Sequence, residues 1–411
     1  MLVPMPPLPS MYRLRQQFDR RKLEDPAAVL AERLRSSPAM AGLRPGMRVA
    51  ITAGSRGIAH IGELVAAVAR EVRARGGEPF VVPAMGSHGG ATAEGQRAML
   101  AGLGVREETV GAPVRSSMEV IEAGRTPEGW PACCDRLAFE ADWIVVMNRV
   151  KPHTAFKAEI ESGLCKMLAV GLGKHRGAEN VHAIGLEKAI VPIARVLLQR
   201  APIGVGIAIV ENSQDETYDL AIAPPEAFED TDRELLKLAK RLLPRLPFDD
   251  LDVLIVREMG KNISGTGMDS NVIGIGRRIG GSHKPEIARV AVLDLTEETH
   301  GNALGIGLAD LTTRRLVDKI DFRATYTNVI TTGFLGTARI PMTLDTDREV
   351  IAVALTGYDP AKVRMAVIRN TLELEEMLIS EGLVEEARAN PSVVIEEEVG
   401  PLCFDAEGRL L

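Results

Sequence analysis

The sequence has little of three things: cysteine, aromatic residues and long apolar runs. Only four of its 411 residues are cysteines, and 4% are aromatic. The cysteines form neither a CxxC pair nor a disulfide framework, so we expect a reducing compartment, the cytoplasm. The longest apolar candidate, residues 189–198, is shorter than the roughly 18 to 20 residues that span a bilayer, and it contains Arg195. The sequence therefore predicts no membrane-spanning segment.

Positive charge is also in short supply. The chain has 49 Lys and Arg against 56 Asp and Glu, which gives a formal net charge of −7. Nucleic acids and anionic membranes attract proteins with a broad excess of basic residues, so we expect neither as a partner. Apolar residues make up 45% of the chain, which is typical of a globular protein with roughly two or three domains at this length. An anionic ligand must therefore meet a local basic patch.

The first eleven residues are apolar but interrupted by four prolines, and the basic residues come after them. A signal peptide has the opposite order, with its basic residues first. We expect an extended arm that lies over its own subunit or a neighbouring one. A homo-oligomer is thus compatible with the sequence.

Six short runs of apolar and β-branched residues alternate with helical patterns. The expected strands are residues 48–52, 79–82, 143–147, 203–210, 253–256 and 288–293. Strands separated by helices are typical of parallel sheets, so the predicted fold class is α/β with largely parallel, Rossmann-like sheets. The clearest helix is residues 61–75, which carry one apolar stripe and end before Gly76 and Gly77.

A domain boundary is predicted where two prolines and a group of acids precede a new strand, at residues 241–252. This gives an N-terminal α/β domain over residues 1–245, a C-terminal α/β domain over 250–390, and a strand and tail over 391–411. Because polar loops follow predicted strands in both domains, we expect an active-site cleft between them.

Three polar loops follow strands of the first domain. They contain Arg56, His88 and His153, and the second of them has glycines on both sides of its histidine. The carboxyl ends of strands form the ligand crevice in open α/β sheets, so these loops should converge. A fourth loop of this kind, residues 258–267, follows a strand in the second domain and contains Lys261.

Two kinds of side chain in these loops can carry chemistry. A loop histidine beside an anionic substrate can act as a general acid or base, because its pKa lies near the working pH. Lys166 lies in the apolar stretch GLCKMLAV, and a desolvated lysine has a lowered pKa and becomes a usable nucleophile. His88, His153 and Lys166 are therefore candidate catalytic residues.

Residues 148–182 form the basic patch that an acidic protein needs for an anionic substrate. Arg149, Lys151 and Lys157, together with Lys261, offer more positive charge than one carboxylate requires. A sugar acid or a dicarboxylate is therefore expected, a substrate larger or more polar than lactate. The stretch from Lys174 to Arg176 is typical of a solvated basic helix face.

Four segments together resemble the nickel-pincer-dependent lactate racemase family of 2-hydroxyacid racemases and epimerases. They are GSHGG, NRVKPHT, ESGLCKMLAVGLGK and EMGKNISGTG, within residues 50–269. The resemblance is to the broad family more than to lactate racemase proper. It implies an isomerase that inverts a 2-hydroxyacid by reversible hydride transfer. It also implies a nickel ion held by a pyridinium-derived mononucleotide, the nickel pincer nucleotide, which is attached covalently to a lysine.

The resemblance also implies roles for particular residues. For the cofactor, Lys166 corresponds to the tethering lysine, Ser162 and Gly163 correspond to the cofactor-binding stretch before it, and His182 corresponds to the nickel ligand. For the reaction, His88 and His153 correspond to the two proton-transfer histidines and Arg56 corresponds to an arginine near the substrate. Lys261 corresponds to a lysine that contacts cofactor or substrate. Two positions depart from the family pattern. Ala53 replaces an acidic residue and Glu258 replaces a glutamine, which bears on the substrate more than on the cofactor.

Two other classes of function remain open. A zinc-dependent hydrolase or lyase could use His153, His175 and His182 as metal ligands, although no HExxH or Cys-rich zinc spacing is present. A non-catalytic anion-binding protein could use the same basic loops. For the nickel ligand, His175 is the alternative to His182.

Overall fold

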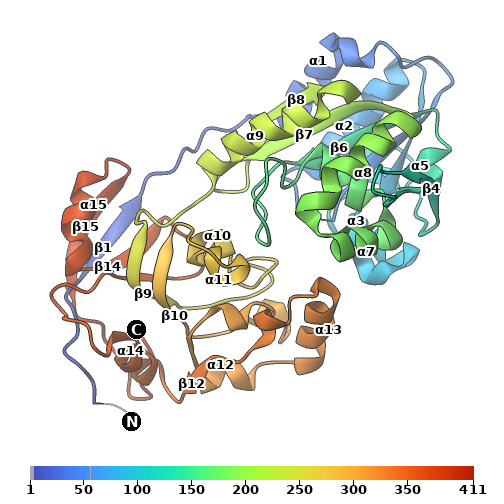
Figure 1. Cartoon of the computed structure of the whole chain (residues 1–411). Coiled ribbons are helices and arrows are strands. Elements are labelled where there is room, and N and C mark those ends of the chain that lie inside the picture. The colour runs from blue at the N-terminus through green and yellow to red at the C-terminus, as the bar shows by residue number, and fades with distance from the viewer. Residues whose placement is uncertain (1–3, 56) are drawn as a thin grey trace. The chain divides into compact units, whose positions relative to one another are not determined.

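The computed structural model describes residues 4–55 and 57–411. The chain divides into two compact units, one formed by Asp19–Leu243 and the other by residues up to Phe18 together with Pro244–Leu411. We call them the 19–243 unit and the 244–411 unit. Figure 1 shows the elements of each. Within the described residues, no helix combines the length and the apolar character needed to cross a membrane.

The 19–243 unit is built on a five-stranded sheet with the strand order β3-β2-β6-β7-β8. Its strands are β2 (Arg48–Ala53), β3 (Glu78–Pro83), β6 (Trp143–Arg149), β7 (Ile203–Glu211) and β8 (Thr217–Ala223). All neighbouring pairs are parallel except β7 and β8. The four predicted strands of this half are thus confirmed, and so is the largely parallel α/β fold class.

Helices cover both faces of this sheet. They are α1 (Pro26–Ser36), α2 (Ile61–Ala74), α3 (Ala93–Gly102), α4 (Glu107–Val110), α5 (Arg136–Phe139), α6 (Leu164–Lys166), α7 (Lys174–Ile184), α8 (Leu186–Arg200) and α9 (Phe228–Leu242). A separate hairpin pairs β4 (Val120–Arg125) with β5 (Pro131–Asp135). Strand side chains alternate between two cores, so that Ile144 and Val146 enter one and Val145 and Met147 the other.

The 244–411 unit contains an eight-stranded sheet with the order β12-β11-β10-β9-β13-β14-β1-β15. Its strands are β1 (Met11–Gln16), β9 (Asp250–Val256), β10 (Glu286–Val292), β11 (Leu311–Thr313), β12 (Met342–Leu344), β13 (Met365–Ile368), β14 (Glu376–Ser380) and β15 (Val393–Gly400). Its helices are α10 (Ser270–Ile273), α11 (Gly276–Ile279), α12 (Arg314–Asp318), α13 (Phe322–Thr332), α14 (Asp347–Leu355) and α15 (Val384–Ala389). The strands from β12 to β13 run parallel.

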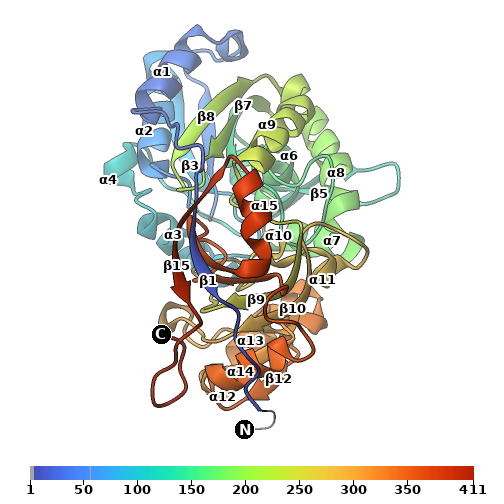
Figure 2. The same cartoon turned by 90° about the vertical axis from the view of Figure 1, so that its left-hand side faces the viewer.

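The first strand differs from the sequence prediction, which assigned residues 1–245 to one domain. β1 lies between β14 and β15 in the sheet of the 244–411 unit and is antiparallel to both (Figure 2). Met11 and Leu14 are fully buried there, so burial of apolar side chains and two ladders of backbone hydrogen bonds hold this strand.

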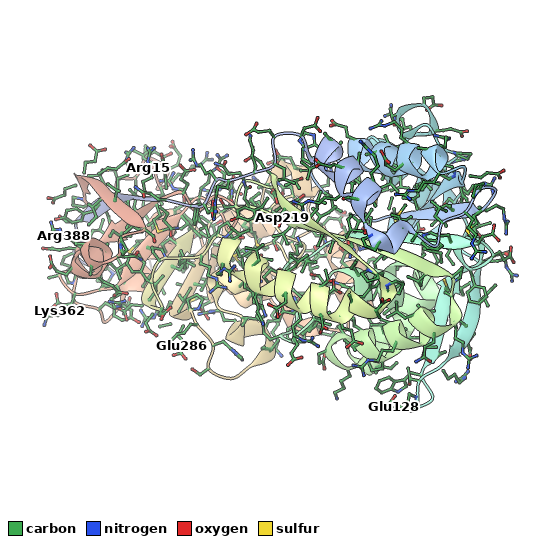
Figure 3. The ribbon with its side chains drawn as sticks, turned by 90° about the horizontal axis from the view of Figure 1, so that it is seen from above. Arg15, Glu128, Asp219, Glu286, Lys362 and Arg388 are labelled. Atoms are coloured by element: carbon green, nitrogen blue, oxygen red, sulfur yellow. The ribbon has the colours of Figure 1, made fainter. Side chains whose placement is uncertain are left out.

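Long charged side chains such as Glu128 and Lys362 lie on the outside of their units (Figure 3).

Candidate active site

The loops after β2, β3 and β6 leave neighbouring parallel strands at the same edge of the sheet. Ala53 and Pro83, the last residues of β2 and β3, are paired in register. Met167, which follows Lys166, lies close to Gly54 in the loop after β2. A Cβ atom built onto Gly54 would stand 3.4 Å from the methyl carbon of Met167. The backbone N–H of Gly86 donates to Gly171 O at 3.2 Å. The loops after β2 and β3 therefore both lie against the segment from Met167 to Gly171.

His88 is exposed at the tip of the loop after β3. Its Nδ1 lies 2.5 Å from the hydroxyl oxygen of Ser55, in the loop after β2. Below the histidine, the fully buried amide of Gln96 donates to the carbonyl oxygens of Gly86 at 2.8 Å and His88 at 3.2 Å. Gln96 thus holds the backbone of the histidine loop from inside the protein.

Lys174 is fully buried, which corrects its assignment to a solvated helix face. Its Nζ donates to Pro83 O at 2.5 Å and to Gln96 Oε1 at 3.1 Å, and it lies 3.0 Å from a carboxylate oxygen of Asp135. Burial lowers the pKa of Lys174, and the charge of Asp135 opposes this effect. Lys174 therefore connects the end of β3 to the residue that supports the His88 loop.

His153 is held by the fully buried carboxylate of Glu161. One oxygen of Glu161 accepts the backbone N–H of His153 at 2.7 Å, and the other lies 2.7 Å from the ammonium of Lys240. The ring of His153 lies against Phe156, with 4.6 Å between centroids, and its Nδ1 accepts the N–H of Ala155 at 3.1 Å. With Nδ1 acting as an acceptor, the neutral ring carries its proton on Nε2.

Ser162 and Gly163 shape the turn before α6. The hydroxyl of Ser162 accepts from Lys151 N and donates to Lys151 O, both at 2.6 Å, which joins this turn to the loop after β6. Gly163 has a φ of +90°, and an added Cβ would stand 2.1 Å from a carboxylate oxygen of Asp232. Both the backbone conformation and the lack of space thus require glycine here.

Asp232 on α9 caps the turn that presents Lys166. Its two carboxylate oxygens accept the backbone N–H groups of Leu164 and Cys165, each at 2.8 Å. The side chain is fully buried, and burial raises its pKa to about 7 although these two N–H groups favour the charged form. The sequence analysis missed Asp232, which fixes the position of α6.

Lys166 is half-buried at the end of α6, and a π-helical turn, Met167–Gly171, follows it directly. Such turns are rare and are frequent at functional sites. His182 lies on α7 and is exposed. Its pKa is nevertheless lowered, first by the packing around its ring and second by the positive charge of Lys166. The positive charge of the predicted tether thus acts on the predicted nickel ligand.

Several residues of the predicted basic patch have acidic partners. Arg149 pairs with the buried carboxylate of Glu211 and lies 3.1 Å from Asp215, and Lys157 lies 3.7 Å from Glu161. Their charge is therefore largely balanced within the protein. The surplus of positive charge that favoured a polar or dicarboxylic substrate is smaller than the sequence indicates.

Two predicted residues do not belong to the described part of the 19–243 unit. Arg56 lies outside the described residues. Lys261 belongs to the 244–411 unit, where its Nζ donates to Asn328 Oδ1 at 2.7 Å and its backbone N–H to the hydroxyl of Thr299 at 3.0 Å. Lys261 is thus anchored next to α13 in its own unit.

The three histidines of the zinc alternative do not form a metal-binding group. Over residues 4–55 and 57–411, no three His, Cys, Asp or Glu side chains are arranged so that they could hold a metal ion. His175 and His182 share α7, but His175 is paired with Glu179, at 3.3 Å. A site with a single protein ligand, as the family resemblance implies, does not need such a group.

Comparisons with known proteins agree with this architecture. Residues 12–188 match the family model described as lactate racemase N-terminal domain. The structure of the lactate racemase apoprotein from Thermoanaerobacterium thermosaccharolyticum is similar, with a TM-score of 0.56 and 12% identity over 88% of this chain and 94% of that chain. A protein from Thermotoga maritima gives a TM-score of 0.49 and 15% identity over 82% and 92%.

None of the curated proteins matches this chain in sequence. At 12% identity the structural likeness concerns the fold alone, whereas the family match covers β2, β3 and β6 with His88, His153, Lys166 and His182. Residues 12–188 are therefore similar in sequence to the lactate racemase N-terminal domain, and the fold of the chain is similar to that of the lactate racemase apoprotein.

Proposed function

We propose that this protein is a racemase or epimerase of a 2-hydroxyacid. The family match supports an isomerase of the racemase type. The observation that carries the proposal is that the loop presenting His88 lies against the π-helical turn that directly follows Lys166, while Ser162 joins the turn before Lys166 to the loop that contains His153. The four cysteines are free, which is typical of proteins in a reducing compartment. We therefore propose that the protein is located in the cytoplasm.

The residues present fit the nickel pincer nucleotide that the family resemblance implies. Lys166 offers an amine for the covalent bond, at a position that Asp232 fixes through the turn before it. His182 offers an imidazole, and its lowered pKa keeps the ring neutral, which a metal ligand requires. When bound, this cofactor would supply a reversible acceptor for a hydride from C2 of the substrate.

The hydrogen bonds of the two histidines favour different roles. If Ser55 accepts the proton on Nδ1 of His88, the neutral ring carries its lone pair on Nε2, which is the form that can act as a base toward the hydroxyl proton of the substrate. In His153 the acceptor nitrogen is already used by Ala155, so Nε2–H can donate a hydrogen bond to the substrate. We therefore propose His88 as the base and His153 as the residue that orients the substrate.

The chemistry of a 2-hydroxyacid explains why a hydride acceptor is needed. The C2 proton beside a carboxylate is only weakly acidic, so direct deprotonation would produce an unfavourable carbanion. If C2 gives up a hydride to such an acceptor, His88 would take the hydroxyl proton, which would leave a bound 2-oxo acid. Return of the hydride to the opposite face of C2, with return of the proton from His88 to the oxygen, would give the other configuration.

The fate of a label at C2 tests this proposal. The cofactor-loaded protein is incubated with 2-deuterated lactate, glycerate, gluconate and malate, and the products are separated by chirality. Hydride transfer predicts that deuterium stays at C2 of the inverted product. Loss of the label to water would indicate a carbanion route and contradict the proposal. Failure of the loaded protein to invert any of these acids would favour the anion-binding alternative.

The assignment of the nickel ligand has a matched control on the same helix. His182→Ala should lower the nickel content of the loaded protein, while peptide mapping should still find the adduct on Lys166. His175→Ala removes an exposed imidazole that pairs with Glu179 on α7, and it should leave nickel unchanged. The reverse pattern would make His175 the ligand.

A further inference from the structure

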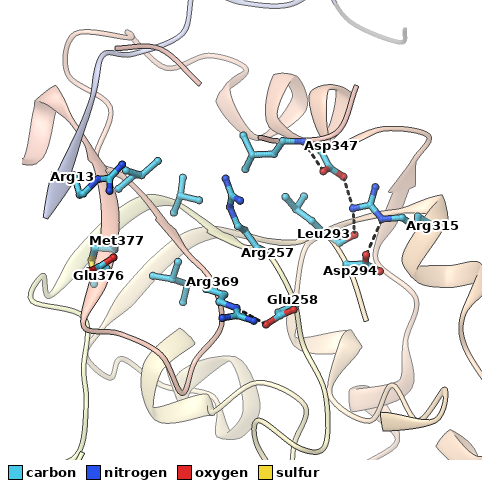
Figure 4. Close-up of a pocket in the computed structure, with 14 residues that line it drawn as sticks. Arg13, Arg257, Glu258, Leu293, Asp294, Arg315, Asp347, Arg369, Glu376 and Met377 are labelled. Carbon is cyan, nitrogen blue, oxygen red and sulfur yellow. Dashed lines mark hydrogen bonds and ion pairs between the residues drawn. The ribbon is translucent and has the colours of Figure 1, made fainter. Parts of the chain in front are cut away.

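A cavity of about 550 Å³ beside β9, β13 and β14 in the 244–411 unit is balanced in charge. Four arginines and four acids line it, and Figure 4 shows Arg369 joined to Glu258 and Arg315 joined to two aspartates. Arg257 donates to the main-chain oxygen of Leu411. With these groups paired, the wall favours a ligand of neither sign. The 19–243 unit, in contrast, contains a charged side chain that is fully removed from solvent.

This side chain belongs to Lys174, which is unfavourable at its position in two respects. The side chain is fully buried, and an ammonium group removed from water needs an opposite charge and acceptors for its N–H groups. The backbone φ of Lys174 is +53°, in the left-handed region that residues other than glycine seldom adopt. A residue of this kind is held by its surroundings, and such residues cluster at active sites.

The ammonium group of Lys174 joins three separate elements. Its three N–H donors meet three oxygens: Pro83 O at the end of β3 at 2.5 Å, Gln96 Oε1 on α3 at 3.1 Å, and a carboxylate oxygen of Asp135 at the end of β5 at 3.0 Å. The other oxygen of Asp135 accepts the N–H of Ala138 in α5 at 2.9 Å. One charged group therefore connects β3, α3 and β5 to the first residue of α7.

Lys174 also determines which way the amide of Gln96 faces. A lysine ammonium group can only donate, so the amide oxygen must face it and the amide nitrogen must face the other side. There the nitrogen donates to Gly86 O at 2.8 Å and to His88 O at 3.2 Å. If the amide turned over, its oxygen would face these two carbonyl oxygens, and the loop would lose both donors. A chain of contacts thus runs from Lys174 through Gln96 to the backbone of His88.

Lys174 lies midway between the two predicted cofactor residues. Lys166 precedes it by eight positions, and His182 follows it by eight on α7. Between Lys166 and Lys174, the π-helical turn also contacts the loop after β3, because Gly171 O accepts the N–H of Gly86 at 3.2 Å. The loop after β3 is therefore fixed at two points by the segment that connects the predicted tether to the predicted nickel ligand.

We propose that Lys174 is a positioning residue that acts through Gln96 on the loop of His88. It holds this loop at a fixed place relative to the cofactor residues. The inference rests on the proposed function, in which His88 and the cofactor act on the same substrate. A displacement of about 1 Å between reacting groups can lower a rate by about 100-fold. Loss of the contact between Lys174 and Gln96 should therefore lower kcat more than it changes KM.

The variants must separate positioning from folding. Lys174→Met alone would leave the buried carboxylate of Asp135 unpaired, so the test uses the double variant Lys174→Met/Asp135→Asn. Replacing both members of a buried ion pair by neutral side chains of similar volume is often close to neutral for stability, and asparagine keeps an acceptor for the N–H of Ala138. Urea denaturation of the double variant should give a midpoint near that of the wild type. Glu94→Gln, which changes an exposed charge on α3, is the control.

The first readout is the kinetics of cofactor-loaded protein on an acid that the wild type inverts. The double variant should lose at least about tenfold in kcat, with KM changed by less than about threefold. Gln96→Met should give a similar loss, and adding it to the double variant should lower kcat little further, because both changes break the same link. Glu94→Gln should keep the wild-type kcat. A stable double variant with wild-type kcat would overturn the proposal, as would losses that multiply when Gln96→Met is added.

The second readout needs neither cofactor nor substrate. In 15N-labelled apoprotein, the chemical shifts of Nδ1 and Nε2 of His88 report which nitrogen carries the proton and whether Ser55 stays next to Nδ1. Both shifts should change in the double variant and in Gln96→Met, and neither should change in Glu94→Gln. Unchanged His88 shifts in the first two would overturn the proposal. Changed shifts in a protein that inverts no 2-hydroxyacid would support the link from Lys174 to His88 while refuting the proposed function.

Discussion

Replacing Asp232 by alanine is expected to destabilise the 19–243 unit by about 3–5 kcal/mol. The carboxylate is fully buried and accepts the N–H groups of Leu164 and Cys165 at 2.8 Å each. At pH 6, below the raised pKa of about 7, the carboxyl group is largely neutral in the native protein, and a buried N–H group left without an acceptor costs roughly 1–3 kcal/mol. Alanine provides no acceptor, leaves both N–H groups unsatisfied and opens a small cavity.

Urea denaturation followed by circular dichroism at pH 6 measures this loss. Asp232→Asn keeps one acceptor oxygen and should lose less than Asp232→Ala. The matched control is Asp230→Ala on the same helix, where an exposed carboxylate pairs with Arg233 and contributes less than about 1 kcal/mol. In folded Asp232→Ala the yield of the Lys166 adduct should also fall, because α6 loses its cap. Equal losses in Asp232→Ala and Asp230→Ala would refute the reasoning.

The same carboxyl group makes stability depend on pH. Burial raises the pKa of Asp232 from 3.8 to about 7, so between these values the native protein holds a proton that the unfolded chain has released. Stability should therefore fall as the pH rises through this window, by up to ~1.4 kcal/mol per unit, and level off above pH 7. Asp232→Asn should lack this part of the slope. A slope that is unchanged in Asp232→Asn would assign it to other groups.

Three further outcomes are expected. Gly163→Ala should destabilise the protein by more than about 3 kcal/mol in urea denaturation. The reason is that residue 163 has a φ of +90° and that a Cβ there would stand 2.1 Å from a carboxylate oxygen of Asp232. A loss below about 1 kcal/mol would contradict this close approach. Lys174→Met should cost about 3–5 kcal/mol, measured the same way at neutral pH, because it leaves a buried carboxylate without its partner at 3.0 Å. Lys166→Met should raise the pKa of His182 in an NMR titration, since it removes the positive charge that contributes to the lowered value; an unchanged pKa would mean that the two side chains are not coupled.

The strands that lead into the site were predictable from local sequence. Residues 48–52 and 143–147 are short apolar runs that only a buried strand accommodates, and they begin β2 and β6 as observed. Parallel strands necessarily present their carboxyl ends at one edge, so the convergence of the following loops could be inferred without knowing any side-chain contact.

The residues that support the catalytic candidates could not be predicted in this way. Asp232 lies between Asp230 and Glu234, which are exposed, and the local sign of its burial is its spacing of four residues from Phe228 and Leu236 on one helix face, which the sequence analysis did not use. Its partners are the N–H groups of Leu164 and Cys165, 68 and 67 positions away in the sequence. Lys174 was misassigned for the same reason, because its burial depends on Pro83 and Gln96.

The position of β1 has a consequence for how the protein is made. Residues 11–16 leave the ribosome before the other strands of their sheet, and their partners β14 and β15 follow more than 350 residues later. At roughly 5–20 residues per second this strand waits on the order of tens of seconds or longer for its partners, while the 19–243 unit can fold as it emerges. The sheet of the 244–411 unit can be completed only after synthesis of β15. Until β1 of the same chain pairs with it, β14 is an open edge to which another nascent chain could add its own β1.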